Sequence, residues 1–184
     1  MRVISGKFKG RKLKTPADLS IRPTLDRVKE SIFNVLGTRI CKSRVLDLFA
    51  GSGSLGFEAL SRGSGKVYFI DKSPDSIRLI KENLALFREL EKETEIIKQD
   101  AAEFLNGFNG NLFDIVFLDP PFKIETNYMV SVFNLLYKGR IIDKNSVIIY
   151  EFFFKRDIEK ETEFFNIDKV SSFGEKKVIY LSLK

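Results

Sequence analysis

Two kinds of hydrophobic pattern alternate along the chain after residue 44. Short apolar runs, such as those at 45–49 and 114–118, have the length and composition of strands buried on both faces of a sheet. The stretches between them repeat apolar residues at intervals of three and four, which is the spacing of one helix face. A chain that alternates strands and helices in this way predicts an α/β fold with a parallel sheet covered on both faces.

The same pattern predicts the approximate bounds of each element. Strands expected to pair in parallel lie at 45–49, 66–71, 95–98, 114–118 and 147–151. Helices are expected at 54–62, 74–87 and 125–137. Two final apolar runs between 164 and 183 predict a C-terminal antiparallel hairpin, which makes a mostly parallel, seven-stranded sheet.

The N-terminal part of the chain, 1–43, follows a different pattern. Short strand-like stretches around Gly6 and Gly10 predict a small hairpin over 2–14. A helix with one apolar face is predicted to begin at Thr24, a suitable N-cap, and to end at Gly37. We therefore expect a small annex of hairpin and helix packed against the main sheet.

Positive charge is concentrated in this annex. Residues 1–44 contain 12 lysines and arginines against 3 acidic residues, whereas the whole chain has a net charge of +6. A lysine-rich terminus can serve solubility alone, but the segment from Met1 to Lys14 contains no acidic side chain, which favours contacts with nucleic-acid phosphates. The side chains expected to make these contacts are Lys7, Lys9, Arg11, Lys12 and Lys14.

The residue types that are missing exclude several chemistries. The chain has no histidine, which rules out a Ser-His-Asp triad and a histidine-ligated zinc, and we expect no metal. Cys41, the single cysteine, precedes the first core strand, so we expect a buried, unreactive thiol in a reducing compartment. No apolar run is long enough to span a membrane, and we expect a soluble, cytoplasmic monomer.

A glycine-rich turn follows the strand at 45–49. Residues 51–56 read G-x-G-x-x-G, and Asp71 ends the next predicted strand, which formally matches a dinucleotide-binding fingerprint and a nicotinamide-dependent oxidoreductase. The rival ligand is S-adenosylmethionine, because Asp47 could hold its ammonium group and Asp71 its ribose hydroxyls. Asp100 could accept a hydrogen bond from its adenine amine, although a helix cap explains Asp100 almost as well. The turn alone leaves both ligands open.

The tetrapeptide Asp119-Pro120-Pro121-Phe122 follows the apolar strand at 114–118. The two prolines stiffen the turn and remove two N–H donors, which leaves a carboxylate and carbonyl oxygens beside an aromatic ring. Such a group of acceptors suits a planar NH₂ group whose ring stacks on Phe122. The turn therefore favours methyl transfer to an exocyclic amine, driven by positioning and electrostatics without a covalent intermediate.

These motifs carry a resemblance to a known family. Asp-Pro-Pro-Phe after the fourth strand and LDLFAGSG after the first resemble class I S-adenosylmethionine-dependent methyltransferases that act on exocyclic amines. With MRVISGKFKGRKLKTP and RPTLDRVKESIFNVL, the chain is similar almost end to end to the bacterial RsmD-type 16S ribosomal RNA guanine-N2 methyltransferases. The resemblance implies one Rossmann-like domain over 1–184, with a basic annex at 1–43 and a cofactor-binding core at 44–184.

The resemblance also implies site residues and partners. The substrate would be 16S ribosomal RNA, within the small ribosomal subunit or an assembly intermediate. Arg22 would join the lysines and arginines of residues 1–14, which we call the basic arm, in binding it. The catalytic group would be Asp119, Pro120, Pro121 and Phe122. The cofactor-binding residues would be Asp47, Ala50, Gly51, Ser52, Gly53, Gly56, Asp71, Lys72, Asp100 and Ala101. The family more often has tyrosine at position 122 and glutamate at position 71. Phenylalanine keeps the stacking surface but lacks the hydroxyl, and aspartate is one methylene shorter yet can still reach a ribose.

Other amine methyltransferases fit less well. A DNA adenine or cytosine methyltransferase usually carries a larger target-recognition segment than 184 residues allow. A protein glutamine methyltransferase usually has asparagine before the two prolines and has no need of a basic arm. A non-enzymatic RNA-binding module would have no need of aspartates at the strand ends.

Overall fold

The strands and helices follow the predicted order along the chain. The computed structural model describes residues 1–15 and 26–184. Its strands are β1 (Arg44–Asp47), β2 (Lys66–Asp71), β3 (Thr94–Lys98), β4 (Ile115–Leu118), β5 (Val147–Phe153), β6 (Phe165–Phe173) and β7 (Lys176–Leu183). Its helices are α1 (Asp26–Leu36), α2 (Ser54–Ser61), α3 (Pro74–Leu84), α4 (Ala101–Gly107) and α5 (Thr126–Lys138), with short 3₁₀ helices η1 (Gly37–Ile40) and η2 (Ala85–Leu90).

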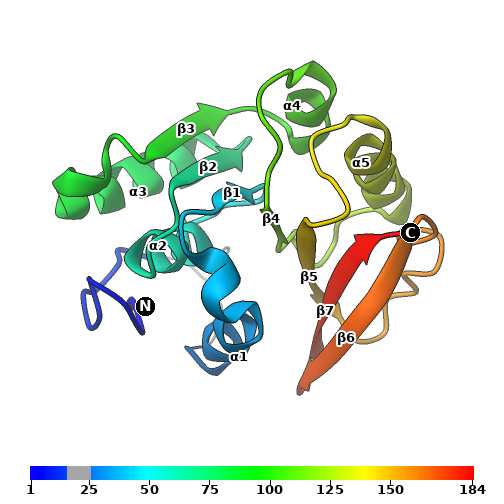
Figure 1. The fold of residues 1–184 in the computed structure, drawn as a ribbon, viewed down its shortest axis with the longest axis horizontal. Helices are drawn as coiled ribbons and strands as arrows, with labels where there is room; N and C mark the ends of the chain where they lie inside the picture. Colours follow the sequence, from blue (N-terminus) through cyan, green and yellow to red (C-terminus); the bar gives the residue numbers. More distant parts are fainter. Residues whose placement is uncertain (16–25) are drawn as a thin grey trace.

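All these strands belong to one sheet, in the order β3-β2-β1-β4-β5-β7-β6 (Figure 1). β1 pairs in parallel with both β2 and β4, and β7 is antiparallel to both β5 and β6. The predicted α/β class, with a C-terminal antiparallel hairpin, is confirmed. The strand order reverses between β1 and β4, and ligands of such sheets bind outside the carboxyl ends of the strands at this point.

Helices cover both faces of the sheet because side chains alternate along each strand. Val45 of β1 belongs to a core cluster with residues of α1, α2 and α3. The next residue, Leu46, belongs to a second cluster with residues of α4 and α5. β1 is therefore buried from both sides, as its continuous apolar run predicts.

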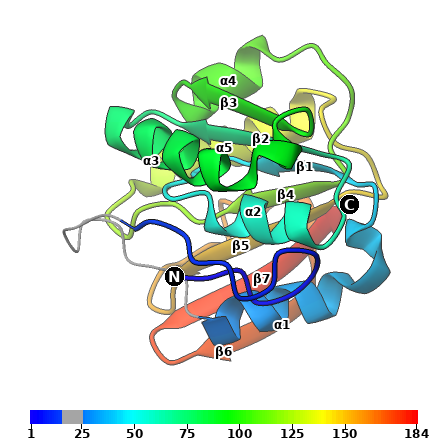
Figure 2. The same ribbon diagram turned by 90° about the vertical axis from the view of Figure 1, so that its left-hand side faces the viewer.

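The N-terminal segment is held both by its own pairing and by α2. Its two halves lie antiparallel, as expected, and the Val3 N–H donates to the Arg11 carbonyl at 2.9 Å, although the bridge between Arg2 and Lys12 is isolated and no strand is assigned in the described part of the segment. The backbone N–H groups of Ile4 and Ser5 donate to the buried carboxylate of Glu58 on α2, at 2.8 and 3.0 Å. Figure 2 shows the segment alongside α2 and close to α1.

Some details differ from the sequence-based expectation. Helix α4 was not predicted, and the third helix stops at Leu84, because Phe87 leaves helical geometry inside η2. Cys41 is exposed, not buried: the chain leaves η1 there and turns through Lys42, with a φ of 59°, before β1 enters the core. The predicted helix start at Thr24 and the RNA contact at Arg22 lie outside the described residues.

Among the described residues, no helix combines the length and the apolar character that crossing a bilayer requires.

Candidate active site

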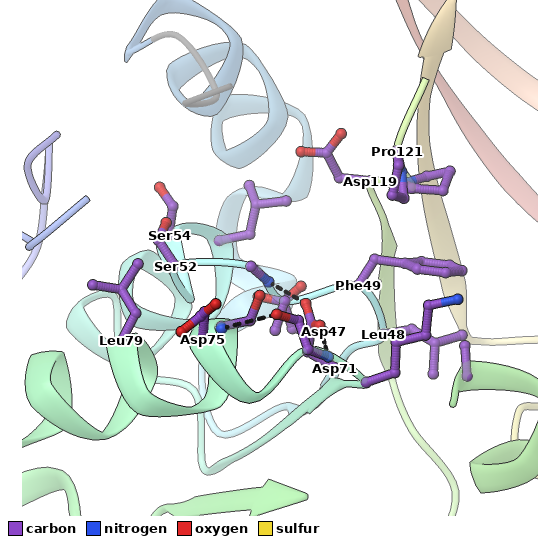
Figure 3. A pocket seen from close by; sticks show the side chains of 18 of the residues that line it. Asp47, Leu48, Phe49, Ser52, Ser54, Asp71, Asp75, Leu79, Asp119 and Pro121 are labelled. Atoms are coloured by element: carbon purple, nitrogen blue, oxygen red, sulfur yellow. Dashed lines mark hydrogen bonds between the residues drawn. The ribbon is translucent and has the colours of Figure 1, made fainter. Parts of the chain in front are cut away.

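A cavity of about 1540 Å³ opens at the carboxyl ends of β1, β2 and β4 (Figure 3). It is lined by residues of both predicted groups, the glycine turn and the Asp119–Phe122 turn. The predicted site residues that line it are Asp47, Ala50, Gly51, Ser52, Asp71, Lys72, Asp100, Ala101, Asp119, Pro120, Pro121 and Phe122. The parallel topology therefore brings together stretches that lie far apart along the chain.

Asp47, the last residue of β1, is buried under the start of α2. Its Oδ2 accepts a hydrogen bond from the Gly56 N–H at 3.0 Å, which caps a helix whose own N-cap residue, Gly53, has no side chain. Burial raises the pKa of Asp47 to about 7, against the lowering effect of the Gly56 N–H, and the nearby Asp71 raises it further. A cation in the cavity would favour the ionised form of this carboxylate, so the site suits a ligand with a positive group at this point.

Asp71, at the end of β2, joins the glycine turn to the start of α3. One carboxylate oxygen accepts from the Gly51 N–H and the other from the Ser73 N–H, each at 2.8 Å. Each oxygen retains a second lone pair, which a ligand hydroxyl could use. Asp71 is therefore both a structural clamp for the turn and a candidate ligand contact.

Asp100 caps helix α4. Its Oδ1 accepts from the Ala102 N–H at 2.9 Å and from the Tyr128 hydroxyl at 2.7 Å. Burial and, to a smaller extent, the hydrogen bond to Asp100 raise the pKa of Tyr128 to about 12. The phenol therefore stays protonated and acts as the donor. The helix-cap role that the sequence left open is thus present, on a residue that also lines the cavity.

Gly53 and Gly56 are absent from the residues that line the cavity. Gly53 has a φ of 77°, in the left-handed region where glycine is preferred. A Cβ on Gly56 would lie 2.2 Å from the ring of Phe69, so this glycine allows α2 to pack closely on β2. The two glycines shape the turn without lining the cavity.

The Asp119–Phe122 turn lies across the cavity from the glycine turn, and Figure 3 shows Asp119 and Pro121 on that side. β4 ends at Leu118, and the chain then closes a turn in which the Ile124 N–H donates to the Pro121 carbonyl at 2.9 Å. The ring of Phe122 is 45% exposed, although the residues of β4 are fully buried. An exposed aromatic ring is suited to stacking against a planar ligand.

The basic arm reaches the cavity at one end. Lys14 lines it, and the backbone N–H of Lys14 donates to Asn83 Oδ1 at 2.7 Å. The amide of Asn83 in turn donates to the carbonyl of Ser52 in the glycine turn, at 3.0 Å. Asn83 therefore ties the end of the arm to the turn.

The other cations of the arm differ in their surroundings. Lys9 and Lys12 are exposed, while Lys7 lies 3.5 Å from Glu89. Arg11 donates to the carbonyl of Leu86 at 2.5 Å and lies over the rings of Phe8 and Phe87. The structure thus leaves Lys9 and Lys12 facing solvent and holds Arg11 against the protein.

Sequence reasoning missed several residues of the cavity wall. Phe49 and Tyr128 line it, as does Lys176 at the start of β7. Phe49 lies at the end of the predicted first strand, and its position next to the glycine turn could have indicated that it lines the cavity. No sequence motif surrounds Lys176, so the sequence gives no signal for it. It reaches the cavity because β7 pairs with β5.

Comparisons with known proteins agree with this geometry. A family model described as "Conserved hypothetical protein 95" matches residues 1–182. The chain is 41% identical over 152 residues to ribosomal RNA small subunit methyltransferase D of Haemophilus influenzae, covering 82% of this chain and 78% of that protein. The same-named protein of Escherichia coli K12 is 39% identical over 123 residues, covering 67% and 61%.

Solved structures show the same fold over the full chain. The structure of yhhF from Escherichia coli covers 100% of this chain and 98% of its own, with a TM-score of 0.88 and 28% identity. The structure of HI0767 from Haemophilus influenzae gives a TM-score of 0.80 at 36% identity, covering 100% and 98%. With a family model over nearly its whole length and relatives at 39% and 41% identity, this chain belongs to the conserved hypothetical protein 95 family, that of the RsmD-type methyltransferases.

Proposed function

We propose that this protein transfers a methyl group from S-adenosylmethionine to the exocyclic N2 amine of a guanine in small-subunit ribosomal RNA. The observation that carries the proposal is one cavity that combines aspartates at three strand ends with an acceptor-only turn ending in an exposed ring. The names of the relatives, which are ribosomal RNA small subunit methyltransferases, support RNA of the small subunit as the substrate. The family membership also argues against the nicotinamide-dependent oxidoreductase that the glycine turn left open.

The residues of the glycine-turn end fit S-adenosylmethionine. Asp47 is a buried carboxylate whose raised pKa a ligand ammonium would offset, and we assign the amino-acid end of the cofactor to it. Asp71 would hold the ribose hydroxyls, and the absence of a side chain at Gly51 allows close approach of the backbone. When bound, S-adenosylmethionine supplies an electrophilic methyl group on a positively charged sulfur.

The opposite end would hold the target amine. Asp119 and the carbonyl oxygens of the proline turn would accept the two N–H groups of guanine N2, while the base stacks on Phe122. Acceptors outside the plane of the base would turn the nitrogen towards tetrahedral geometry and direct its lone pair at the methyl carbon. We assign Asp119 as the acceptor of the proton that the nitrogen releases afterwards. Positioning and electrostatics then supply the rate.

The guanine must leave its stack to enter the cavity. Lys9 and Lys12, which face solvent on the basic arm, would hold the RNA backbone without reading its sequence. Lys14 would extend this contact to the cavity, which it lines.

The proposal is tested by methyl transfer to small ribosomal subunits from cells that lack the modification, with nucleoside mass spectrometry of the product. We expect N2-methylguanosine with the wild-type protein. Asp119→Ala should lower the rate roughly 10²- to 10³-fold, as the loss of a transition-state hydrogen-bond partner does elsewhere, while calorimetry shows unchanged cofactor affinity.

Asp168→Ala is the matched control, because Asp168 bonds Ser182 on the exposed hairpin and does not line the cavity. A wild-type rate for Asp119→Ala would remove the catalytic assignment. Methylation of DNA or of a protein glutamine in parallel assays, without N2-methylguanosine, would replace the proposed substrate.

A further inference from the structure

A second, smaller cavity of about 400 Å³ adjoins the first. Phe122 and Lys176 line both cavities, so they stand at the junction between them. The other walls of the second cavity come from Arg27 of α1 and from the ends of β5, β6 and β7. The C-terminal hairpin therefore places a cation directly beside the proposed base-stacking ring.

Lys176 is held firmly in this position. It is the first residue of β7, it is 7% exposed, and its Nζ forms an ion pair with Oε1 of Glu151 on β5. The same Nζ lies 5.2 Å from the centre of the Phe122 ring. A lysine ammonium has three N–H donors, so this ion pair leaves donors for a ligand in the cavity.

The ion pair is poorly explained by stability alone. Glu151 is 3% exposed, and its second oxygen, Oε2, is buried without a hydrogen-bond partner in the described part of the chain. Buried ion pairs contribute little net stability even when every atom is satisfied, and unsatisfied buried oxygens are rare. A functional role accounts better for a buried lysine at the junction of two cavities.

We propose that Lys176 donates a hydrogen bond to the O6 carbonyl of the target guanine, so that the site recognises this atom in addition to the N2 amine. The inference rests on the proposed function, because it takes the N2 amine to lie at Asp119 and the base to lie on Phe122. The O6 atom of guanine is an acceptor, whereas the corresponding atom of adenine is an amine donor that an ammonium repels. Asp119 reads the donor side of the base and Lys176 its acceptor side. Lys176 is thus a specificity-determining residue.

The test compares two substrates that share the N2 amine. Small subunits are reconstituted with RNA that carries either guanine or 2-aminopurine at the target position. 2-Aminopurine has hydrogen in place of O6 and no proton on N1, so the share of the preference that depends on O6 is the share that substitution of Lys176 removes. The wild-type protein should methylate guanine roughly 10- to 100-fold faster, the range expected for a hydrogen bond from a charged donor. Lys176→Met should lower the rate on guanine towards that on 2-aminopurine and leave the rate on 2-aminopurine unchanged, and Lys176→Arg should keep the preference for guanine.

Lys177→Met is the matched control, since Lys177 is the neighbour of Lys176 on β7 and lines neither cavity. It should keep the wild-type preference. An equal loss on both substrates with Lys176→Met would overturn the proposal, because a phosphate contact or a structural role acts on both alike.

If Lys176→Met does not fold, Glu151→Gln and the wild-type protein decide the question. Glu151→Gln should weaken the preference because it releases Lys176, and equal wild-type rates on guanine and 2-aminopurine would overturn the inference. Failure of the proposed function gives a different result, since the wild-type protein would then form no N2-methylguanosine from the guanine substrate.

Discussion

The two ends of the large cavity use their carboxylates in different ways. At the glycine-turn end, the side chains of Asp47, Asp71 and Asp100 each accept backbone N–H groups that shape the turn or cap a helix. At the other end, Asp119 is followed by two prolines that have no N–H to donate, and then by an exposed ring. At the glycine-turn end the carboxylates bind backbone N–H groups of the protein, and at the Asp119–Phe122 end the cavity is lined by a proline turn and an exposed ring.

This difference separates two kinds of function. A carboxylate that holds a turn also fixes the position of a bound cofactor, so stability and cofactor affinity depend on the same hydrogen bonds. A turn that the two prolines already stiffen depends less on any one side chain for its shape. We therefore expect substitutions at the two ends to affect different measurements.

Among substitutions at the glycine-turn end, the largest effect is expected for Asp71→Ala. It removes the hydrogen bonds from Gly51 and Ser73, which should lower the free energy of unfolding by roughly 1–3 kcal/mol and the affinity for S-adenosylmethionine roughly 10- to 100-fold. Urea denaturation and calorimetry measure the two quantities. Asp75→Ala is the control, because Asp75 also lines the cavity but bonds only an exposed arginine among the described side chains. If Asp71→Ala weakened cofactor binding but left the free energy of unfolding unchanged, stability and cofactor affinity would not depend on the same hydrogen bonds at this end of the cavity.

The second prediction concerns the ionisation of Asp47. Burial raises its pKa from 3.8 to about 7, so between these two pH values the folded protein keeps a proton that the unfolded chain has lost. The free energy of unfolding therefore falls as pH rises from about 4 to about 7. Cofactor affinity should change in the opposite direction, rising up to about tenfold per pH unit below pH 7, because the ammonium group pairs with the ionised carboxylate. Calorimetry between pH 5.5 and 7 checks this slope.

Two controls accompany the pH series. The ligand 5′-methylthioadenosine lacks the amino-acid end and should bind with a flat pH profile, and Asp47→Asn should remove the slope for S-adenosylmethionine. Parallel slopes for the two ligands would show that Asp47 does not contact the ammonium group.

The smallest effect is expected in the basic arm, outside both ends of the cavity. Reversing the charges of Lys9 and Lys12 to glutamate should weaken RNA binding several-fold at low salt and flatten its salt dependence, because fewer counterions are released. The control reverses Lys138, the last residue of α5, and Lys144, which precedes β5, because both are exposed and neither belongs to the N-terminal segment. Binding curves across a salt series that coincide for the two variants would refute a specific role for the arm.

The sequence predicted the fold class well because its signals are local and regular. Buried parallel strands read as continuous apolar runs, and the helices between them keep a helical period, so the order of elements follows from the chain alone. Helix α4 escaped prediction because it is short and caps itself through Asp100, which reads equally well as a ligand contact. The exposure of Cys41 escaped it because a single left-handed residue, Lys42, redirects the chain.

The pattern of hydrophobic and polar residues could not predict contacts between segments that are distant along the chain. The N-terminal segment pairs its two halves locally, but the backbone N–H groups of Ile4 and Ser5 donate to Glu58, in a helix far along the chain. The hydrogen bond from Tyr128 to Asp100 likewise joins separate helices. No periodicity or motif encodes such pairs, because each partner is an ordinary polar residue within its own stretch.

By itself the sequence determined the chemistry that is available: aspartates at the ends of strands, a glycine turn before a helix, and an acceptor-only turn with a ring. These features are short and continuous, so they can be recognised without a structure. Only the tertiary structure decided which groups share one cavity, that Asp47 is buried under α2, and that Lys176 of the last strand lies beside Phe122. The physical reason is that burial and proximity depend on strand order, and strand order is a property of the whole sheet.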